Sequence, residues 1–158
     1  MPIVYKSHSN KNPSYVLLTA TGTFFLSIWH AFRVPSFRRK AGIRYPNVYA
    51  TPEQIDQAPT EDKKLAMYLL NCAQRAHHHF LENYPSVLAA LLIAGLKYPV
   101  ASASLGALWS FGRVLFATGY TRADKKDGTG RYRGGINYIG QLGLYGLVAK
   151  TGYDLLMS

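Results

Sequence analysis

Four stretches of the chain are long and apolar enough to form membrane-spanning helices. We predict spans at about residues 15–34, 65–96, 98–121 and 134–157. About 20 apolar residues in a helix cross the ~30 Å hydrocarbon core of a bilayer, because each residue rises about 1.5 Å. The connections between these stretches are short, which favours antiparallel neighbours. The pattern therefore predicts an all-α fold, an integral-membrane four-helix bundle that forms a single domain over residues 1–158.

The second stretch changes character at Pro85. The part before this proline is amphipathic, whereas the part after it is almost purely apolar. A proline inside a membrane helix kinks it and frees one carbonyl, which neighbouring helices can satisfy. We expect one long helix that begins outside the membrane and then enters it.

The placement of charge distinguishes this chain from a soluble domain, although its overall composition does not. The chain has 158 residues, of which 48% are hydrophobic, and its formal net charge is +10. Mean hydropathy is −0.06, an ordinary value for a soluble protein. However, the apolar residues 15–32, 65–96, 98–121 and 134–157 hold few charged residues: Arg75, Glu82, Arg113, Lys150 and Asp154. A charge in hydrocarbon costs roughly 2.5–3.5 kcal/mol, so a membrane protein must sort its charges in this way.

The cations indicate how the chain is oriented. Residues 33–64 and 122–133 together hold 12 of the 18 lysines and arginines. The positive-inside rule places both loops in the cytosol and both termini outside or in a lumen. Because these cations lie in loops rather than along one polar face, we expect no nucleic-acid partner. A single cysteine, Cys72, excludes an internal disulfide.

A stripe of polar side chains interrupts the second span. Its members recur at steps of three and four residues and so share one helical face: Asn71, Arg75, His78, His79 and Glu82. That face cannot point at lipid. One reading is an internal salt bridge, Arg75 with Glu82 or Glu82 with Arg113. The other is a binding site for a small, highly charged ligand at the cytosolic boundary, because one buried pair does not need so many polar groups.

The run His77-His78-His79 does not indicate a metal site. Consecutive residues on a helix point about 100° apart, whereas two ligands for one ion need to be four residues apart. We therefore expect no metal. On the third span, Arg113, Phe116 and Tyr120 share a face, and Tyr120 lies next to the cytosolic loop.

Several motifs resemble the membrane-associated proteins in eicosanoid and glutathione metabolism, the MAPEG family. These are FRRKAGIRYPNVYA, NCAQRAHHHFLENYP, GRVLFATGYT and RYRGG, in that order. Within the family the likeness is greatest to the type 3 microsomal glutathione transferases. The resemblance implies a homotrimer of four-helix subunits in the endoplasmic reticulum or another intracellular membrane. It also implies that glutathione binds between subunits on the cytosolic side.

The resemblance also implies roles for individual residues. The glutathione-binding set would be Arg38, Arg75, His77, His79, Glu82, Phe116 and Tyr120, with Arg38 supplied by the adjacent subunit. Arg133 matches the arginine that hydrogen-bonds the glutathione sulfur, and Arg131 is the competing assignment. The sequence departs from the family pattern at two positions: His79 replaces a usual asparagine, and Phe116 replaces a tyrosine.

The implied activity is conjugation of the glutathione thiolate to a lipophilic electrophile that enters from the membrane lipid, with reduction of lipid hydroperoxides as a second reaction. A cleft with arginines and a glutamate matches the two carboxylates and one ammonium of glutathione in sign. A non-catalytic, lipid-presenting scaffold of the same fold is the alternative. A third hypothesis is that the polar stripe serves only to hold the trimer together.

Overall fold

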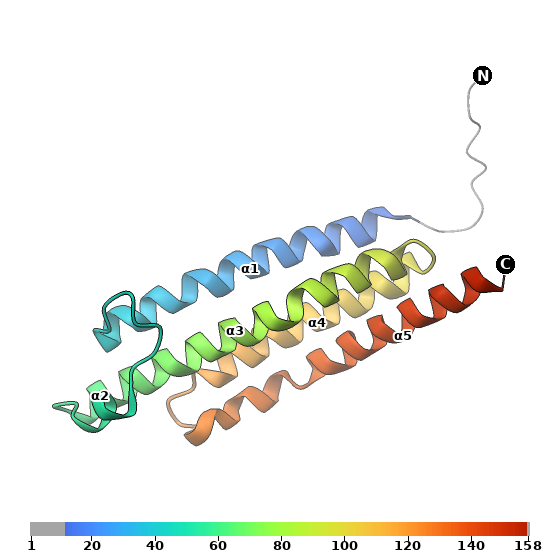
Figure 1. The fold of residues 1–158 in the computed structure, drawn as a ribbon. Coiled ribbons are helices and arrows are strands. Elements are labelled where there is room, and N and C mark those ends of the chain that lie inside the picture. Colours follow the sequence, from blue (N-terminus) through green and yellow to red (C-terminus); the bar gives the residue numbers. More distant parts are fainter. Residues whose placement is uncertain (1–11, 158) are drawn as a thin grey trace.

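The computed structural model describes residues 12–157, and long helices make up most of them (Figure 1). The elements in chain order are α1 (Ser14–Ala41), α2 (Pro52–Asp56), α3 (Glu61–Gly95), α4 (Pro99–Tyr120), the 3₁₀ helix η1 (Lys126–Gly134) and α5 (Ile136–Leu156). No strand occurs within this part of the chain. The predicted all-α class is therefore confirmed.

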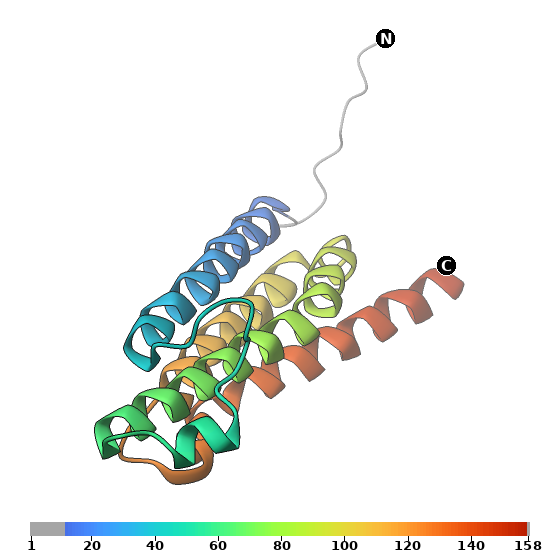
Figure 2. The same ribbon diagram turned by 60° about the vertical axis from the view of Figure 1, so that its left-hand side comes forward.

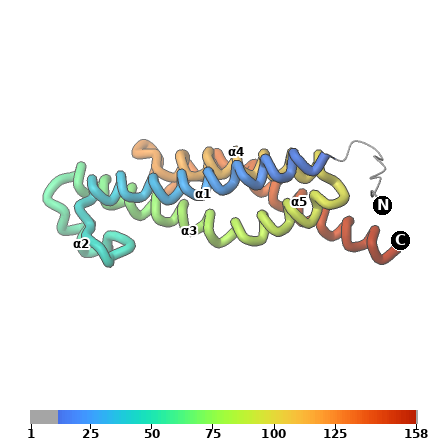
Figure 3. Tube along the Cα trace, turned by 90° about the horizontal axis from the view of Figure 1, so that it is seen from above, coloured from blue at the N-terminus to red at the C-terminus, as the bar shows by residue number. Residues whose placement is uncertain are grey.

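The long helices α1, α3, α4 and α5 run side by side (Figures 1 and 2). Helices α3 and α4 contact each other and also pack against both α1 and α5, so they form the middle of the molecule. Seen from above in Figure 3, α2 lies at one end, and the last turns of α5 diverge from the other helices at the opposite end. The α1–α3 and α4–α5 connections share the α2 end, as the predicted orientation of the two basic loops requires.

Two of the described helices are long and apolar enough to cross a membrane by length and composition. They are α1 and α4. On α1, large apolar side chains point outward, among them Leu18, Phe25 and Phe32, which are 72%, 68% and 76% exposed. Contiguous apolar surface of this kind fits lipid or a partner chain better than water. The prediction of four spans stays a prediction.

Helix α1 continues beyond the predicted end of its span at residue 34. Its last turns are held by burial of Val34, Arg38 and Ala41. The helix ends where Gly42 adopts a left-handed conformation, φ 68°, and donates its amide to the Arg38 carbonyl. Glycine reaches this conformation without steric cost, which makes it a common helix terminator. Hydropathy alone does not reveal this extension, because its outward side chains are polar.

The connection between α4 and α5 packs tightly onto α4 through glycines. A side chain on Gly119 or on Gly130 would collide with the other residue's carbonyl, so the two backbones lie in direct contact. Gly134 meets the backbone of Phe116 in the same way. These glycines allow η1 to lie against α4, and this explains the glycine-rich sequence of the loop.

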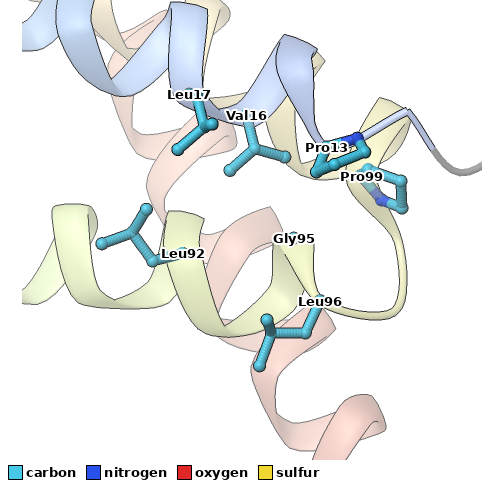
Figure 4. Close-up of a pocket in the computed structure, with 7 residues that line it drawn as sticks. All are labelled: Pro13, Val16, Leu17, Leu92, Gly95, Leu96 and Pro99. Carbon is cyan, nitrogen blue, oxygen red and sulfur yellow. The ribbon is translucent and has the colours of Figure 1, made fainter. Parts of the chain in front are cut away.

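An apolar cavity lies at the end of the molecule opposite α2, between the start of α1, the end of α3 and the start of α4 (Figure 4). Its volume is about 370 Å³. Its lining consists of Pro13, Val16, Leu17, Leu92, Gly95, Leu96 and Pro99. We call it the apolar cavity. It has no polar side chain in its lining and therefore offers no chemistry beyond hydrophobic contact.

Candidate functional site

Part of the polar stripe on α3 holds the segment 43–50 against the helix. The side-chain amide of Asn71 donates to the Ala50 carbonyl and accepts from the Ala50 amide, both at 2.8 Å. Gln74 donates to the Val48 carbonyl at 2.7 Å. These bonds satisfy backbone groups that would otherwise lack partners. Asn71 therefore has a structural partner, which accounts for one member of the stripe without a ligand.

Arg38 anchors the same segment from α1. Its guanidinium donates to the carbonyls of Asn47 at 2.5 Å and Val48 at 3.3 Å and lies 4.4 Å from the centre of the Tyr45 ring. The side chain is buried, with 7% of the residue exposed. Arg38 is thus occupied within its own chain, and its predicted contact with glutathione in an adjacent subunit stays a prediction.

The three consecutive histidines face three different neighbours. His77 is turned toward α1, where its ring lies 6.3 Å from that of His30. His78 Nδ1 is 2.8 Å from the Tyr49 hydroxyl. His79 Nδ1 accepts a hydrogen bond from the Arg113 guanidinium at 2.7 Å. A guanidinium only donates, so Nδ1 of His79 carries no proton in this arrangement.

Phe116 belongs to the contact between α3 and α4. Its ring stacks on His79 with centroids 4.9 Å apart and lies 4.6 Å from the guanidinium carbon of Arg113. Phe116 and Arg113 are both buried, the latter completely. His79 and Phe116, the two departures from the family pattern, therefore contact each other. They form a stacked pair around a buried arginine.

Arg75 and Glu82 form an ion pair on the outer face of α3. The Arg75 Nη1 and Glu82 Oε1 atoms are 2.7 Å apart, and the two side chains are 47% and 53% exposed. Glu82 pairs with Arg75 and not with Arg113. An ion pair exposed to this degree contributes little to stability, because water screens it. A ligand with its own carboxylate and ammonium groups could replace this pair at small cost.

A second cavity adjoins this ion pair, between α3, the end of α4 and the start of η1. Its volume is about 370 Å³. Its lining consists of Tyr49, Tyr68, Asn71, Cys72, Arg75, Tyr120, Asp127 and Gly128. We call it the tyrosine cavity. It combines one cation, one carboxylate, an amide and three hydroxyls, which is a set suited to a polar ligand.

Tyr120 forms the α4 wall of the tyrosine cavity. Its ring lies 5.5 Å from the guanidinium carbon of Arg131 and packs edge-on against Phe116 with centroids 5.6 Å apart. Its hydroxyl makes no hydrogen bond with any residue between 12 and 157 that the structure describes. Tyr120 can therefore donate to a ligand without breaking an existing bond.

The two competing arginines of η1 differ in their environments. Arg131 donates to the Asp127 carbonyl at 2.8 Å and to the Tyr132 hydroxyl at 3.0 Å. Arg133 is exposed and has no hydrogen bond or ion pair with the described part of the chain. Arg131 is thus fixed against its own helix, whereas Arg133 is free to contact a ligand or a neighbouring subunit.

Two groups in the loops near the tyrosine cavity, Tyr49 and Asp124, have shifted pKa values. Burial raises the pKa of the Tyr49 phenol, so this hydroxyl stays protonated at neutral pH. In the loop after α4, the Arg122 guanidinium lowers the pKa of Asp124 through two hydrogen bonds. The protonated Tyr49 hydroxyl forms its hydrogen bond with His78 Nδ1 beside the tyrosine cavity.

Of the residues predicted from sequence, the structure brings Arg75 and Tyr120 together in the tyrosine cavity and places Glu82 against Arg75. Four other predicted residues make side-chain contacts within the chain instead: Arg38, His77, His79 and Phe116. The sequence reasoning missed Tyr49 and Tyr68 as cavity residues. Tyr49 carries no spacing signal, because it follows α1 in an irregular segment. Tyr68 lies three residues before Asn71 on α3, so extending the polar stripe by one turn would have found it.

A model of the MAPEG family matches residues 16–153, which is most of the chain. The chain belongs to the MAPEG family. Members of this family are membrane-associated, and they include membrane glutathione transferases, peroxidases and non-enzymatic proteins. The matched region covers all of α3 and α4 and nearly all of α1 and α5, so the tyrosine cavity lies wholly inside it.

Proposed function

We propose that this MAPEG protein is a membrane-bound glutathione transferase of the type 3 microsomal kind. It conjugates the glutathione thiolate to lipophilic electrophiles and reduces lipid hydroperoxides with the same thiolate. In this proposal the protein is a homotrimer in the endoplasmic reticulum or another intracellular membrane, with the site facing the cytosol. No metal takes part.

The observation that carries the proposal is the exposed Arg75–Glu82 pair beside a cavity in which the Tyr120 hydroxyl has no partner in the described chain. Glutathione has two carboxylates and one ammonium. Arg75 can bind a carboxylate through two parallel hydrogen bonds, and Glu82 can accept from the ammonium. Tyr120 adds a free donor on the opposite wall. The signs of the charged groups complement those of the tripeptide.

The chemical step needs the thiolate, since a thiol with a pKa near ~8.5 is only a few per cent ionised at neutral pH. A guanidinium beside the sulfur stabilises the anion and lowers the thiol pKa without itself exchanging a proton. In conjugation the sulfur forms a bond to the electrophilic carbon, and the leaving group departs with its electron pair. Arg133 supplies this guanidinium in our proposal, because it is exposed and has no partner in the described chain.

Reduction of a lipid hydroperoxide follows from the same thiolate. The sulfur attacks the terminal peroxide oxygen, the oxygen–oxygen bond breaks, and the lipid alkoxide leaves and takes up a proton. The glutathione sulfenic acid then reacts with a second glutathione to give the disulfide and water. The two electrons that reduce the hydroperoxide therefore come from two glutathione molecules.

The test uses detergent-purified full-length protein. We expect conjugation of glutathione to an aryl halide, reduction of a fatty-acid hydroperoxide and measurable glutathione binding. Absence of both activities together with absence of glutathione binding would reject the proposal. Saturable binding of a lipid without either activity would instead support the lipid-presenting scaffold.

A separate variant tests whether the polar stripe serves only as trimer contact. Under that hypothesis Glu82→Gln dissociates the oligomer and glutathione has no effect on it. Under our proposal the variant keeps its oligomeric state and loses glutathione affinity. Size-exclusion chromatography with light scattering, with and without glutathione, distinguishes the two outcomes.

A further inference from the structure

The start of η1 is tied to α3 by one side chain that the proposed reaction does not otherwise use. The Gly128 amide donates a hydrogen bond to the Tyr68 hydroxyl at 2.6 Å. Tyr68 lies on α3, 60 residues away in sequence. The bond therefore joins two walls of the tyrosine cavity directly, and both residues line it.

The backbone at this hydrogen bond has an unusual, left-handed conformation. Asp127 and Gly128 both have positive φ, 53° and 61°. A side chain on Gly128 would collide with the Tyr120 ring, so the turn lies directly beneath that ring. Tyr68 thus holds one side of the turn and Tyr120 covers the other.

The conformation of this turn determines where the arginines of η1 lie. Arg131 donates to the carbonyl of Asp127, a member of the same turn, and its guanidinium carbon is 5.5 Å from the Tyr120 ring. Arg133 follows two residues later in the same short helix. If the turn relaxes, both guanidinium groups move relative to Arg75 and Tyr120.

We propose that Tyr68 is a positioning residue: its hydroxyl fixes the 127–128 turn, so that the arginine of η1 that stabilises the thiolate is held at the tyrosine cavity. This inference rests on the proposed glutathione function and does not depend on whether Arg131 or Arg133 contacts the sulfur. Tyr68 acts through the loop backbone and does not itself need to touch the reacting sulfur.

The test is Tyr68→Phe, which removes only the hydroxyl. We expect hydrogen exchange at the Gly128 amide to rise about 3- to 10-fold, which is the effect of losing one hydrogen bond. The pH midpoint for ionisation of bound glutathione, followed by thiolate ultraviolet absorbance, should rise by about 0.5–1 unit, and kcat should fall about 3- to 10-fold. Affinity for an S-alkyl glutathione, which has no thiol to ionise, should stay within about twofold.

The matched control is Tyr84→Phe on the same helix. Its hydroxyl is 3.1 Å from the Thr23 hydroxyl, so the variant also loses one buried contact, far from η1. It should leave both Gly128 exchange and the ionisation midpoint unchanged. Gly128→Ala is a second perturbation of the same turn and should raise the midpoint at least as far as Tyr68→Phe.

The outcomes separate this inference from the proposed function. Unchanged Gly128 exchange in Tyr68→Phe, or a midpoint shift equal to that of Tyr84→Phe, overturns the positioning role. If the unmodified protein neither binds glutathione nor ionises it while Gly128 exchange still responds to Tyr68→Phe, the glutathione function fails and the loop contact stands.

Discussion

The tyrosine cavity and the apolar cavity have the same volume, about 370 Å³ each, and lie toward opposite ends of α3. The apolar cavity is lined by proline, valine, leucine and glycine. The tyrosine cavity carries an arginine, a carboxylate and three phenols, beside a weak ion pair that a ligand can replace. The two cavities therefore differ in the chemistry of their linings and not in size, and only the tyrosine cavity offers groups that can hydrogen-bond a polar ligand.

The largest expected effect concerns catalysis by η1, the element that begins at the tyrosine cavity. Arg133→Ala should lower kcat for glutathione conjugation about 100-fold, because a positioned cation that stabilises a developing anion contributes on that scale. Glutathione affinity should change far less. Steady-state kinetics and calorimetric binding in detergent measure both quantities.

The control for that prediction is Arg131→Ala in the same helix. If Arg131→Ala lowers kcat by this amount and Arg133→Ala does not, the roles of the two arginines are exchanged. If neither variant affects kcat, η1 does not supply the thiolate-stabilising group.

The second prediction concerns binding. Arg75→Ala should weaken glutathione binding about 10- to 100-fold, since a hydrogen bond to a charged group is lost together with its ionic character. Arg39→Ala, an exposed cation on α1 near the same end of the molecule, serves as the charge-matched control. Equilibrium dialysis with radiolabelled glutathione gives both affinities. Equal losses in the two variants would mean that Arg75 acts only through its charge and does not contact glutathione directly.

The third prediction tests the apolar cavity. A methyl group on Gly95 would lie 2.8 Å from the Val16 side chain, so Gly95→Ala forces α1 and α3 apart. We expect a loss of about 1–3 kcal/mol in the free energy of unfolding, as in other overpacked interiors. Glutathione affinity should change by less than about twofold, because distant sites act independently. Thermal unfolding measures the loss of stability, and dialysis measures glutathione affinity. A large loss of affinity would mean that the apolar cavity and the tyrosine cavity are energetically coupled.

The smallest expected effect is a titration beside the tyrosine cavity. The Arg122 guanidinium lowers the pKa of Asp124 below its usual 3.8. Because the folded-state pKa is depressed, any stabilisation from this pair is present at neutral pH and is lost as pH falls through the folded value. Arg122→Gln should return the Asp124 midpoint in a carboxyl NMR titration toward 3.8. An unchanged midpoint would mean that the pair does not form in solution.

The helical class and the positions of the main helices could be predicted from hydropathy. For instance, the predicted stretch 98–121 compares with α4 at Pro99–Tyr120. Apolar composition and proline positions report directly on such elements. The continuation of α1 to Ala41 and the 3₁₀ helix η1 could not be predicted in this way, because both are selected by packing against distant residues and have polar outer faces.

The candidate site was only partly predictable for a related reason. Spacing along α3 identified the polar face, but it could not show which members of that face bind the chain itself. Asn71 pairs with the backbone of Ala50, and His79 with Arg113, through contacts that depend on tertiary structure. Arg75 pairs with Glu82 on the same helix, and both side chains stay about half exposed.

The glycine contact between α4 and η1 also limits where the chain can be altered by design. With no side chains between Gly119 and Gly130, added bulk or extra residues after Thr129 would separate two backbones that now touch. The exposed stretch from Ala123 to Lys126 has no such constraint. A fluorophore or affinity tag for following this protein in lipid nanodiscs therefore belongs in that stretch, a few residues before the turn that Tyr68 holds.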